Sequence, residues 1–289
     1  MTYRSVFRPG LFQDQVVIVT GGGSGIGRCI AHELTSLGAH VVIFGRTEDK
    51  LRRVVAEITE DGGRASYEIC DIRDDEAVVR AVSAVKAAHG RVHGLVNNAG
   101  GQFPSPLASI SKRGFEAVVR TNLLGTFLMS NQVFEQCFSE HGGAVVNIVA
   151  DCERGMPGMG HSGAARAGVI NLTKTAAVEW SASGVRVNAV APGFIASSGI
   201  DTYDNSIQEV IVPLMRDSVP LRRFGSEAEV SGAVCFLLSE AASFITGVLL
   251  QVDGAAPLAS PIDQLNKERR LIPPFEGFHR AKLPDAMSR

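Results

Sequence analysis

The segment TGGGSGIG, residues 20–27, decides the fold class of this chain, because it follows the apolar run QVVIVT (15–20) directly and leads into a helix-length segment. Three of its glycines, Gly21, Gly25 and Gly27, stand where the backbone must turn tightly between a strand and a helix. A side chain here would block the approach of a diphosphate to the amide groups that open the helix. The segment therefore predicts a dinucleotide-binding turn.

Ser24 and Ile26 lie between these glycines and belong to the same predicted site, because backbone amides at the start of a helix bind anions. A strand-to-helix turn without any ligand is the alternative interpretation of the glycines alone. A nucleoside-triphosphate loop would continue with Lys and then Ser or Thr after its last glycine. Here Arg28 and Cys29 follow Gly27, which excludes that class of ATP-binding protein.

The rest of the chain alternates apolar, β-branched runs with amphipathic segments of helix length. The runs predict seven strands: QVVIVT, HVVIFG, RASYEIC, GLVNNAG, AVVNIV, VRVNAV and VLLQVD. The predicted helices include 48–60, 74–89, 115–138, 164–181 and 227–238. Runs that are apolar throughout indicate strands covered on both faces. We therefore expect a Rossmann-type, doubly wound α/β fold with a seven-stranded parallel sheet, in which ligands bind beyond the carboxyl ends of the strands.

One domain is expected over residues 1–257, because a chain of 289 residues with 45% hydrophobic content can form one large core and has no break in composition. Within it, residues 194–225 form a connection longer than an ordinary loop, and we expect this insertion to cover the substrate. A plain helical cap on the sheet is the alternative. Residues 258–289 are expected to form a tail that lies over the domain or over a neighbouring subunit.

The composition favours a small-molecule partner. The formal net charge is −2 and the basic residues are dispersed, so neither a nucleic-acid footprint nor a membrane-binding patch is visible. The chain begins without the apolar core of a secretory signal, ends in AMSR rather than an SKL-type address, and has no run of roughly 18 apolar residues, so we expect a soluble, cytoplasmic protein. Its five cysteines form no CxxC pair, which favours buried thiols and no metal site.

The end of the second predicted strand bears on the choice of cofactor. An acidic residue here would bind the ribose hydroxyls of NAD, but Arg46 follows Gly45 instead. Because a guanidinium can pair with a 2′-phosphate, NADP(H) is favoured over NAD(H). Alternatively, Arg46 stacks over the adenine or lies in solvent, with Glu48 or Asp49 nearby.

Together with the glycine-rich turn, NNAG at 97–100, Asn122 and the pair Pro192-Gly193 resemble the short-chain dehydrogenase/reductase family over residues 15–255. Singly, NNAG could be an ordinary strand-ending turn and Asn122 a helix-kinking residue. The resemblance implies the following cofactor contacts: Asn98, Ala99 and Gly100 at the adenine ribose, Asp71 and Ile72 at the adenine, Pro192 and Gly193 near the nicotinamide, and Ser197 at its carboxamide.

The chain departs from this family at the reacting centre. The family's usual catalytic set is Asn, Ser, Tyr and Lys, and the corresponding positions here hold Asn122, Val149, Ser162 and Arg166. The family's tyrosine works because a lysine lowers its pKa from about 10, and a serine hydroxyl cannot be tuned that far. None of the three tyrosines in the chain lies near this segment in sequence. Ordinary ketone or alcohol chemistry is therefore disfavoured.

The segment HSGAARAGVINLTKTAAVEW (161–180), with GGQF (100–103), resembles the branch of the family that contains the peroxisomal trans-2-enoyl-CoA and 2,4-dienoyl-CoA reductases. The resemblance implies that Arg166 holds the nicotinamide ribose, that Ser162 hydrogen-bonds a thioester oxygen and that Asn122 orders a water or the helix. The proton for the α carbon would come from water, His161 or Asp151.

Structural interpretations of these residues remain open. Ser162 would serve equally as the N-cap of the helix that follows, His161 as a loop histidine and Asp151 as a turn residue or partner of Arg154.

These observations predict an NADPH-dependent reductase of an unsaturated acyl thioester, with acyl-CoA as the expected carrier. The alternatives are a carbonyl or alcohol oxidoreductase with an unusual acid, and a cofactor-binding scaffold without catalysis. Arg216, Arg222 and Arg223 are candidates for binding the phosphates of coenzyme A. The family resemblance also implies a homotetramer, built through the helices predicted at 115–138 and 164–181.

Overall fold

The computed structural model of the protein describes residues 2–200, 205–260 and 270–287. Its centre is a parallel sheet of seven strands in the order β3-β2-β1-β4-β5-β6-β9. The predicted fold class is confirmed, and the strands have these bounds: β1 Val16–Thr20, β2 His40–Gly45, β3 Arg64–Ile69, β4 Gly94–Asn97, β5 Gly143–Ile148, β6 Val185–Pro192 and β9 Leu249–Val252. The short strands β7 (Ile195–Ala196) and β8 (Gly225–Ser226) pair with each other outside this sheet.

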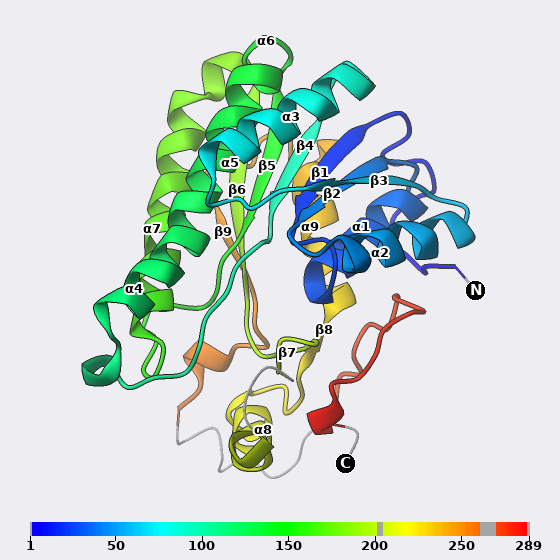
Figure 1. Cartoon of the computed structure of the whole chain (residues 1–289). Coiled ribbons are helices and arrows are strands. Elements are labelled where there is room, and N and C mark those ends of the chain that lie inside the picture. The colour runs from blue at the N-terminus through cyan, green and yellow to red at the C-terminus, as the bar shows by residue number, and fades with distance from the viewer. Residues whose placement is uncertain (1, 201–204, 261–269, 288–289) are drawn as a thin grey trace.

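Helices cover both faces of the sheet, with α1, α2 and α9 on one face and α3, α4, α5 and α7 on the other (Figure 1). Their bounds are α1 Gly25–Ser36, α2 Glu48–Glu60, α3 Asp75–His89, α4 Lys112–Val119, α5 Gly125–Val133, α6 Ser139–His141, α7 Gly160–Glu179, α8 Asn205–Ser218 and α9 Glu227–Leu238. The order of the strands reverses direction between β1 and β4, so the carboxyl ends of these two strands flank the crevice in which such folds bind ligands.

Strand β1 shows why an uninterrupted apolar run predicts a covered parallel strand. Val17 and Val19 belong to the hydrophobic core beneath α1, α2 and α9, whereas Val16 and Ile18 belong to the core beneath α3 and α5. Each side chain is buried, because successive residues of a strand point to opposite faces. The sheet is thus a rigid platform that holds the loops at its carboxyl edge.

The helix predicted at 115–138 begins earlier and is less regular than expected. It starts at Lys112, because the side chain of Ser111 caps its first turn. A π-helical turn, Arg120–Leu124, interrupts it and contains Asn122. Such turns are often found at functional sites.

The insertion at 194–225 contains β7 and α8. Residues 201–204, including Tyr203, lie outside the described residues. The insertion includes a helix of its own, so it is more than an extended loop.

The described part of the C-terminal tail lies on the domain of its own chain. Phe278 is buried and stacks on Tyr3 with ring centroids 5.7 Å apart. Arg280 pairs with Asp61, at the end of α2, at 2.8 Å. Residues 261–269 of the predicted tail are outside the described part of the chain.

Several sequence-based expectations concern the chain as a whole. All five cysteines are buried thiols, as predicted. Within residues 2–200, 205–260 and 270–287, no helix is long and apolar enough to cross a membrane. The same residues include no group of three or more His, Cys, Asp and Glu side chains that could hold a metal ion.

Candidate cofactor and active site

The glycine-rich turn joins β1 to α1 at the crevice, and its three key glycines have different roles. A Cβ atom at Gly21 would lie 2.9 Å from the Asn98 side chain, and one at Gly27 would lie 2.5 Å from the Gly21 carbonyl oxygen. At Gly25, which has a φ of +55°, a Cβ would meet only Ser198 Oγ at 3.5 Å and Glu227 Oε1 at 3.8 Å. Gly21 and Gly27 therefore permit close packing, whereas at Gly25 it is the positive φ that favours glycine, because a Cβ there would make only ordinary van der Waals contacts. Ser24 and Ile26 flank Gly25 at the start of α1.

Hydrogen bonds between Thr20, at the start of the turn, and the segment that follows β4 hold the turn in place. Thr20 Oγ1 accepts hydrogen bonds from the backbone amides of Asn98 and Ala99, both at 3.0 Å. The Asn98 side chain donates in return to the carbonyl oxygens of Thr20, at 3.1 Å, and Gly21, at 3.3 Å. The amide of Asn98 thus fixes the turn, and this structural use was not predicted from the NNAG motif.

A cavity of about 260 Å³ opens beside the turn, at the ends of β1, β2 and β4. Its lining includes most of the predicted residues for the adenine side together with two unpredicted cations: Gly21, Ser24, Arg46, Lys50, Asp71, Ile72, Arg73, Asn98, Ala99 and Gly100. Arg73 hydrogen-bonds both carboxylate oxygens of Asp71, and this lowers the pKa of Asp71. Because Asp71 and Arg73 neutralise each other, Arg46 and Lys50 give the cavity its net positive charge.

Arg166 lies on α7, deep beside the loop that follows β4. Its Nη1 donates to the Ile148 carbonyl oxygen at 2.6 Å, while its Nε is buried and has no hydrogen-bond partner among the described residues. Burial lowers the pKa of Arg166 to about 10, so the guanidinium remains charged at neutral pH. A Cβ at Gly100 would lie 2.5 Å from Arg166 Nη2, which explains why glycine occupies this position.

Asn122 is fully buried in its π-helical turn and binds the loop rather than its own helix. Its Oδ1 accepts from the Gly101 amide at 2.8 Å, and its Nδ2 donates to the Gly101 carbonyl oxygen at 2.9 Å. These two bonds set the position of residues 100–103 next to Arg166.

Ser162 is not an N-cap, which corrects one interpretation of the sequence. Helix α7 begins at Gly160 with Met159 as its N-cap, so Ser162 lies inside the first turn. The Ser162 hydroxyl is buried and donates to Gln102 Oε1 at 2.7 Å. Sequence analysis assigned no role to Gln102, although its motif GGQF had been singled out.

His161 is a buried residue of the same helical turn rather than a loop residue. Its Nδ1 accepts from the Ser162 amide at 2.8 Å, which leaves Nε2 as the ring nitrogen that can donate to another group. That Nε2 is buried and has no hydrogen-bond partner within the described ranges, and the ring lies edge-on to Phe103 at 4.3 Å.

Asp151 follows β5 and provides an acidic group at the same edge. Its Oδ1 is buried without a hydrogen-bond partner in the part of the chain that the structure describes. Burial raises the pKa of Asp151, and the nearby charges of Asp253 and Glu153 raise it further. Among the same residues no direct ion pair joins Asp151 to Arg154, but the Arg154 charge lowers the pKa of Asp151 and so opposes part of the rise.

Pro192 and Gly193 stand at the end of β6, opposite this group. The Gly193 amide donates to the Val252 carbonyl oxygen at 3.0 Å, and a Cβ at Gly193 would lie 2.7 Å from Asp253 Cα. Glycine thus lets β6 and the loop after β9 meet closely. Ser197 lies five residues after Pro192, the last residue of β6, and directly after β7. Its carbonyl oxygen accepts a hydrogen bond from the Ile200 amide at 3.1 Å.

The three arginines of the insertion are already engaged within their own chain. Arg223 makes two hydrogen bonds to Glu229, at 2.7 and 2.9 Å. Arg216 pairs with the Asp217 carboxylate at 3.0 Å, and Arg222 donates to the Asp217 carbonyl oxygen. These contacts argue against the suggested role of the three side chains at coenzyme A phosphates.

The fold and this constellation define a dinucleotide-binding oxidoreductase, and comparison with known proteins agrees. A family model described as "Enoyl-(Acyl carrier protein) reductase" matches residues 21–255. The chain belongs to the short-chain dehydrogenase/reductase family, whose members bind NAD(P).

Among its relatives, a peroxisomal 2,4-dienoyl-CoA reductase of Danio rerio is 39% identical over 90% of this chain and 87% of its own length. A 3-oxoacyl-[acyl-carrier-protein] reductase of Staphylococcus epidermidis is 35% identical over 83% of this chain and 98% of its own length. The solved structure of a citronellol catabolism dehydrogenase (AtuB) of Pseudomonas aeruginosa PAO1 superposes with a TM-score of 0.80 at 57% identity, over 88% of this chain and 99% of its own. Both kinds of reductase and a dehydrogenase are therefore similar to this chain.

Proposed function

We propose that the protein is an NADPH-dependent reductase of the C=C bond of a 2-enoyl or 2,4-dienoyl acyl thioester, with acyl-CoA as the substrate. The observation that carries this proposal is the pair Ser162 and Arg166, which occupy the positions of the family's tyrosine and lysine. Without a phenol there, proton exchange with an alcohol oxygen is disfavoured, whereas reduction of a conjugated C=C bond needs only a donor to the thioester oxygen and an acid for the α carbon.

The bound cofactor would supply a hydride to the conjugated carbon chain. Arg166 holds the nicotinamide ribose and contributes a fixed positive charge. The Ser162 hydroxyl, which donates to Gln102 in the free protein, turns to the thioester oxygen as negative charge develops there. Asn122 keeps the Gly101 backbone and thus Gln102 in position.

Asp151 is the proposed acid for the α carbon. Its raised pKa keeps a larger fraction of the carboxyl protonated at a given pH than an exposed aspartate would have. His161 is the second candidate, because its Nε2 is also buried without a partner among the described residues.

The preference for NADPH rests on Arg46 and Lys50. They supply positive charge at the adenine end of the cavity, where a 2′-phosphate would lie, and Asp71 is neutralised by Arg73. Among the described residues that line the cavity, no unpaired carboxylate is thus available to bind the ribose hydroxyls of NAD.

Reduction of a 3-oxoacyl thioester, or oxidation of an alcohol, is the second candidate function. The names of the Staphylococcus and Pseudomonas relatives favour it, and Asp151 would then exchange its proton with the substrate oxygen. The name of the Pseudomonas relative also suggests a thioester with a branched acyl chain as a substrate to test, since citronellol is a branched unsaturated alcohol. A silent scaffold is disfavoured, because unpaired buried atoms such as Arg166 Nε each cost about 1–3 kcal/mol and typify functional sites.

Steady-state oxidation of NADPH separates these functions. Crotonyl-CoA, 2,4-hexadienoyl-CoA and a branched 2-enoyl-CoA test the first, and acetoacetyl-CoA tests the second. We expect turnover with the unsaturated substrates and at least about tenfold lower kcat/KM with acetoacetyl-CoA. Turnover with acetoacetyl-CoA alone would contradict the proposal, and NADPH binding without turnover of any substrate would favour the scaffold.

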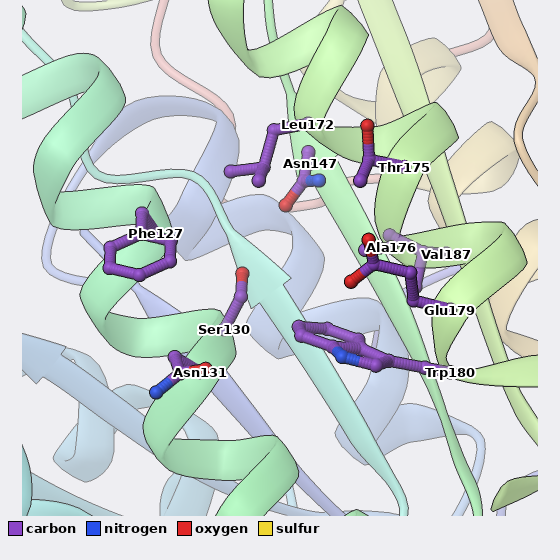
Figure 2. Close-up of a pocket in the computed structure, with 10 residues that line it drawn as sticks. All are labelled: Phe127, Ser130, Asn131, Asn147, Leu172, Thr175, Ala176, Glu179, Trp180 and Val187. Atoms are coloured by element: carbon purple, nitrogen blue, oxygen red, sulfur yellow. The ribbon is translucent and has the colours of Figure 1, made fainter.

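We also propose that the protein is a homotetramer and cytoplasmic. A cavity of about 120 Å³ lies between α5 and α7, lined among others by Phe127, Ser130, Leu172 and Trp180 (Figure 2). Phe127 is 44% exposed and Val178, on α7, is 75% exposed, so apolar surface on both helices is available to a second copy. Light scattering tests the assembly, and fractionation of the source cells tests the compartment, given that the Danio relative is named peroxisomal.

A further inference from the structure

Glu227 is a buried carboxylate at the glycine-rich turn, far from the reacting centre in sequence. It is the first residue of α9, the helix that packs against α1, and only 7% of its surface is exposed. Its Oε1 lies 3.8 Å from the position of a Cβ at Gly25. At Gly25 a Cβ atom would make only ordinary van der Waals contacts, so the carboxylate lies beside the backbone amides that open α1, which are the groups expected to bind a diphosphate.

The charges around Glu227 leave it without a direct partner. Among the described residues its carboxylate makes no hydrogen bond or ion pair. Arg28, on α1, is the nearest opposite charge, but its guanidinium is engaged by Glu57 at 2.7 Å. On α9 itself, Glu229 is paired with Arg223.

Among the described residues, the Cys29 thiol of α1, which is fully buried, also faces Glu227. Burial raises the pKa of Glu227 to about 7, and Arg28 opposes part of that rise. Since its pKa lies above the ordinary value, Glu227 keeps its proton at mildly acidic pH and loses it as the pH rises through neutrality.

An ionised carboxylate and a diphosphate that lie next to each other repel. A protonated carboxyl group can instead donate a hydrogen bond to a phosphate oxygen. We infer that Glu227 is a further cofactor-binding residue, which meets the diphosphate of the dinucleotide as a neutral carboxylic acid, so that cofactor binding takes up a proton from solvent. This inference rests on the proposed cofactor site and extends it.

The affinity for the cofactor therefore depends on pH. Bound diphosphate holds the proton on Glu227, while the free protein releases it above neutral pH. The dissociation constant then rises by up to about tenfold for each pH unit above the pKa of the free protein. The fold thus couples cofactor occupancy to pH through a residue that does not touch the substrate.

Calorimetric titration with NADH and NADPH between about pH 6 and about pH 9 tests the inference. NADH is the main probe, because the 2′-phosphate of NADPH itself titrates near about pH 6. For the unaltered protein we expect an NADH dissociation constant at least about tenfold higher at the alkaline end. Repetition in two buffers with different ionisation enthalpies should reveal uptake of close to one proton at the alkaline end.

The Glu227→Gln variant should bind NADH with a dissociation constant that changes less than about twofold over the same range, without proton uptake. Glu76→Gln, which removes an exposed carboxylate on α3, is the matched control and should behave like the unaltered protein. If Glu227→Gln does not fold, as judged by circular dichroism, Glu227→Ala replaces it.

Equal pH dependence in the Glu227 variant and the unaltered protein would overturn the inference, as would binding of NADH without proton uptake. The proposed function would survive both results. If neither nucleotide bound at any pH, the cofactor site itself would be wrong, and the inference would fail with it.

Discussion

The adenine end and the reacting end of the proposed site are built in different ways. The adenine end is organised by backbone: a glycine-rich turn that Thr20 and Asn98 tie to the segment after β4, with the charges of Arg46 and Lys50 beside it. The reacting end consists of side chains from separate loops and helices, among them Gln102, Asp151 and Arg166. A backbone site follows from one contiguous motif, whereas a side-chain site depends on contacts between distant segments. The reacting end is consequently where this chain departs from its family.

Asp151 lies at the reacting end, and its substitution by Asn should have the largest effect on catalysis. If Asp151 is the acid, kcat with an enoyl-CoA drops about 10²–10⁴-fold, while the dissociation constant for NADPH is unchanged. In the unaltered protein the rate should fall as the pH rises through the raised pKa of Asp151, because the acid must be protonated.

Glu140→Gln is the matched control for that substitution, since it removes an exposed carboxylate on α6 that is not among the charges acting on Asp151. A kcat for Asp151→Asn within about threefold of the unaltered protein would transfer the acid role to His161 or to water.

Ser162→Ala should have the next largest effect. It removes a proposed donor to the thioester oxygen, so kcat falls about 10²–10³-fold with little change in NADPH affinity. Ser181→Ala, just beyond the other end of α7, is the control and should retain full activity. Stopped-flow measurement of hydride transfer provides the rate, and a loss confined to KM would mean that Ser162 only positions substrate.

At the adenine end, Arg46→Ala should weaken NADPH binding about 10–100-fold and leave NADH binding nearly unchanged, because one charged contact to the 2′-phosphate is lost. Fluorescence titration of both nucleotides measures this selectivity. Arg52→Ala, which removes an exposed arginine of α2 paired with Glu48, should change neither constant. Equal weakening of both nucleotides would indicate that Arg46 stacks on the adenine instead.

The Asn122 side chain anchors the loop that connects the adenine end to the reacting end. Asn122→Ala should have the smallest effect among these substitutions. It deletes both hydrogen bonds to Gly101, and we expect the free energy of unfolding to fall by about 1–3 kcal/mol in urea titrations. Asn171→Ala, at an exposed position of α7, should stay within about 0.5 kcal/mol. A stability loss no larger than that of the control would show that Asn122 does not anchor the loop.

The contrast between one contiguous backbone motif and side chains from distant segments also explains what could be predicted from the sequence. The positions of the strands along the chain, the glycine-rich turn and the location of Arg46 follow from local patterns, because hydrophobic periodicity and turn chemistry act over few residues. Lys50, Arg73 and Glu227 were missed, since their proximity to the turn arises only when β2, β3 and α9 are assembled around it. The first turn of α7 was also missed: its sequence GHSG contains two glycines, which are poor helix formers, and tertiary packing overrides that preference.

The proposed function requires that hydride reach a carbon of a conjugated chain at a centre where Ser162 replaces the tyrosine of the family. Deuterium transfer from NADPH labelled at the reactive position of the nicotinamide, followed by mass spectrometry of the product of crotonyl-CoA, tests it most directly. One deuterium is expected at the β carbon of butyryl-CoA. Absence of label from crotonyl-CoA, together with deuterium at the hydroxyl-bearing carbon of 3-hydroxybutyryl-CoA when acetoacetyl-CoA is supplied, would contradict it.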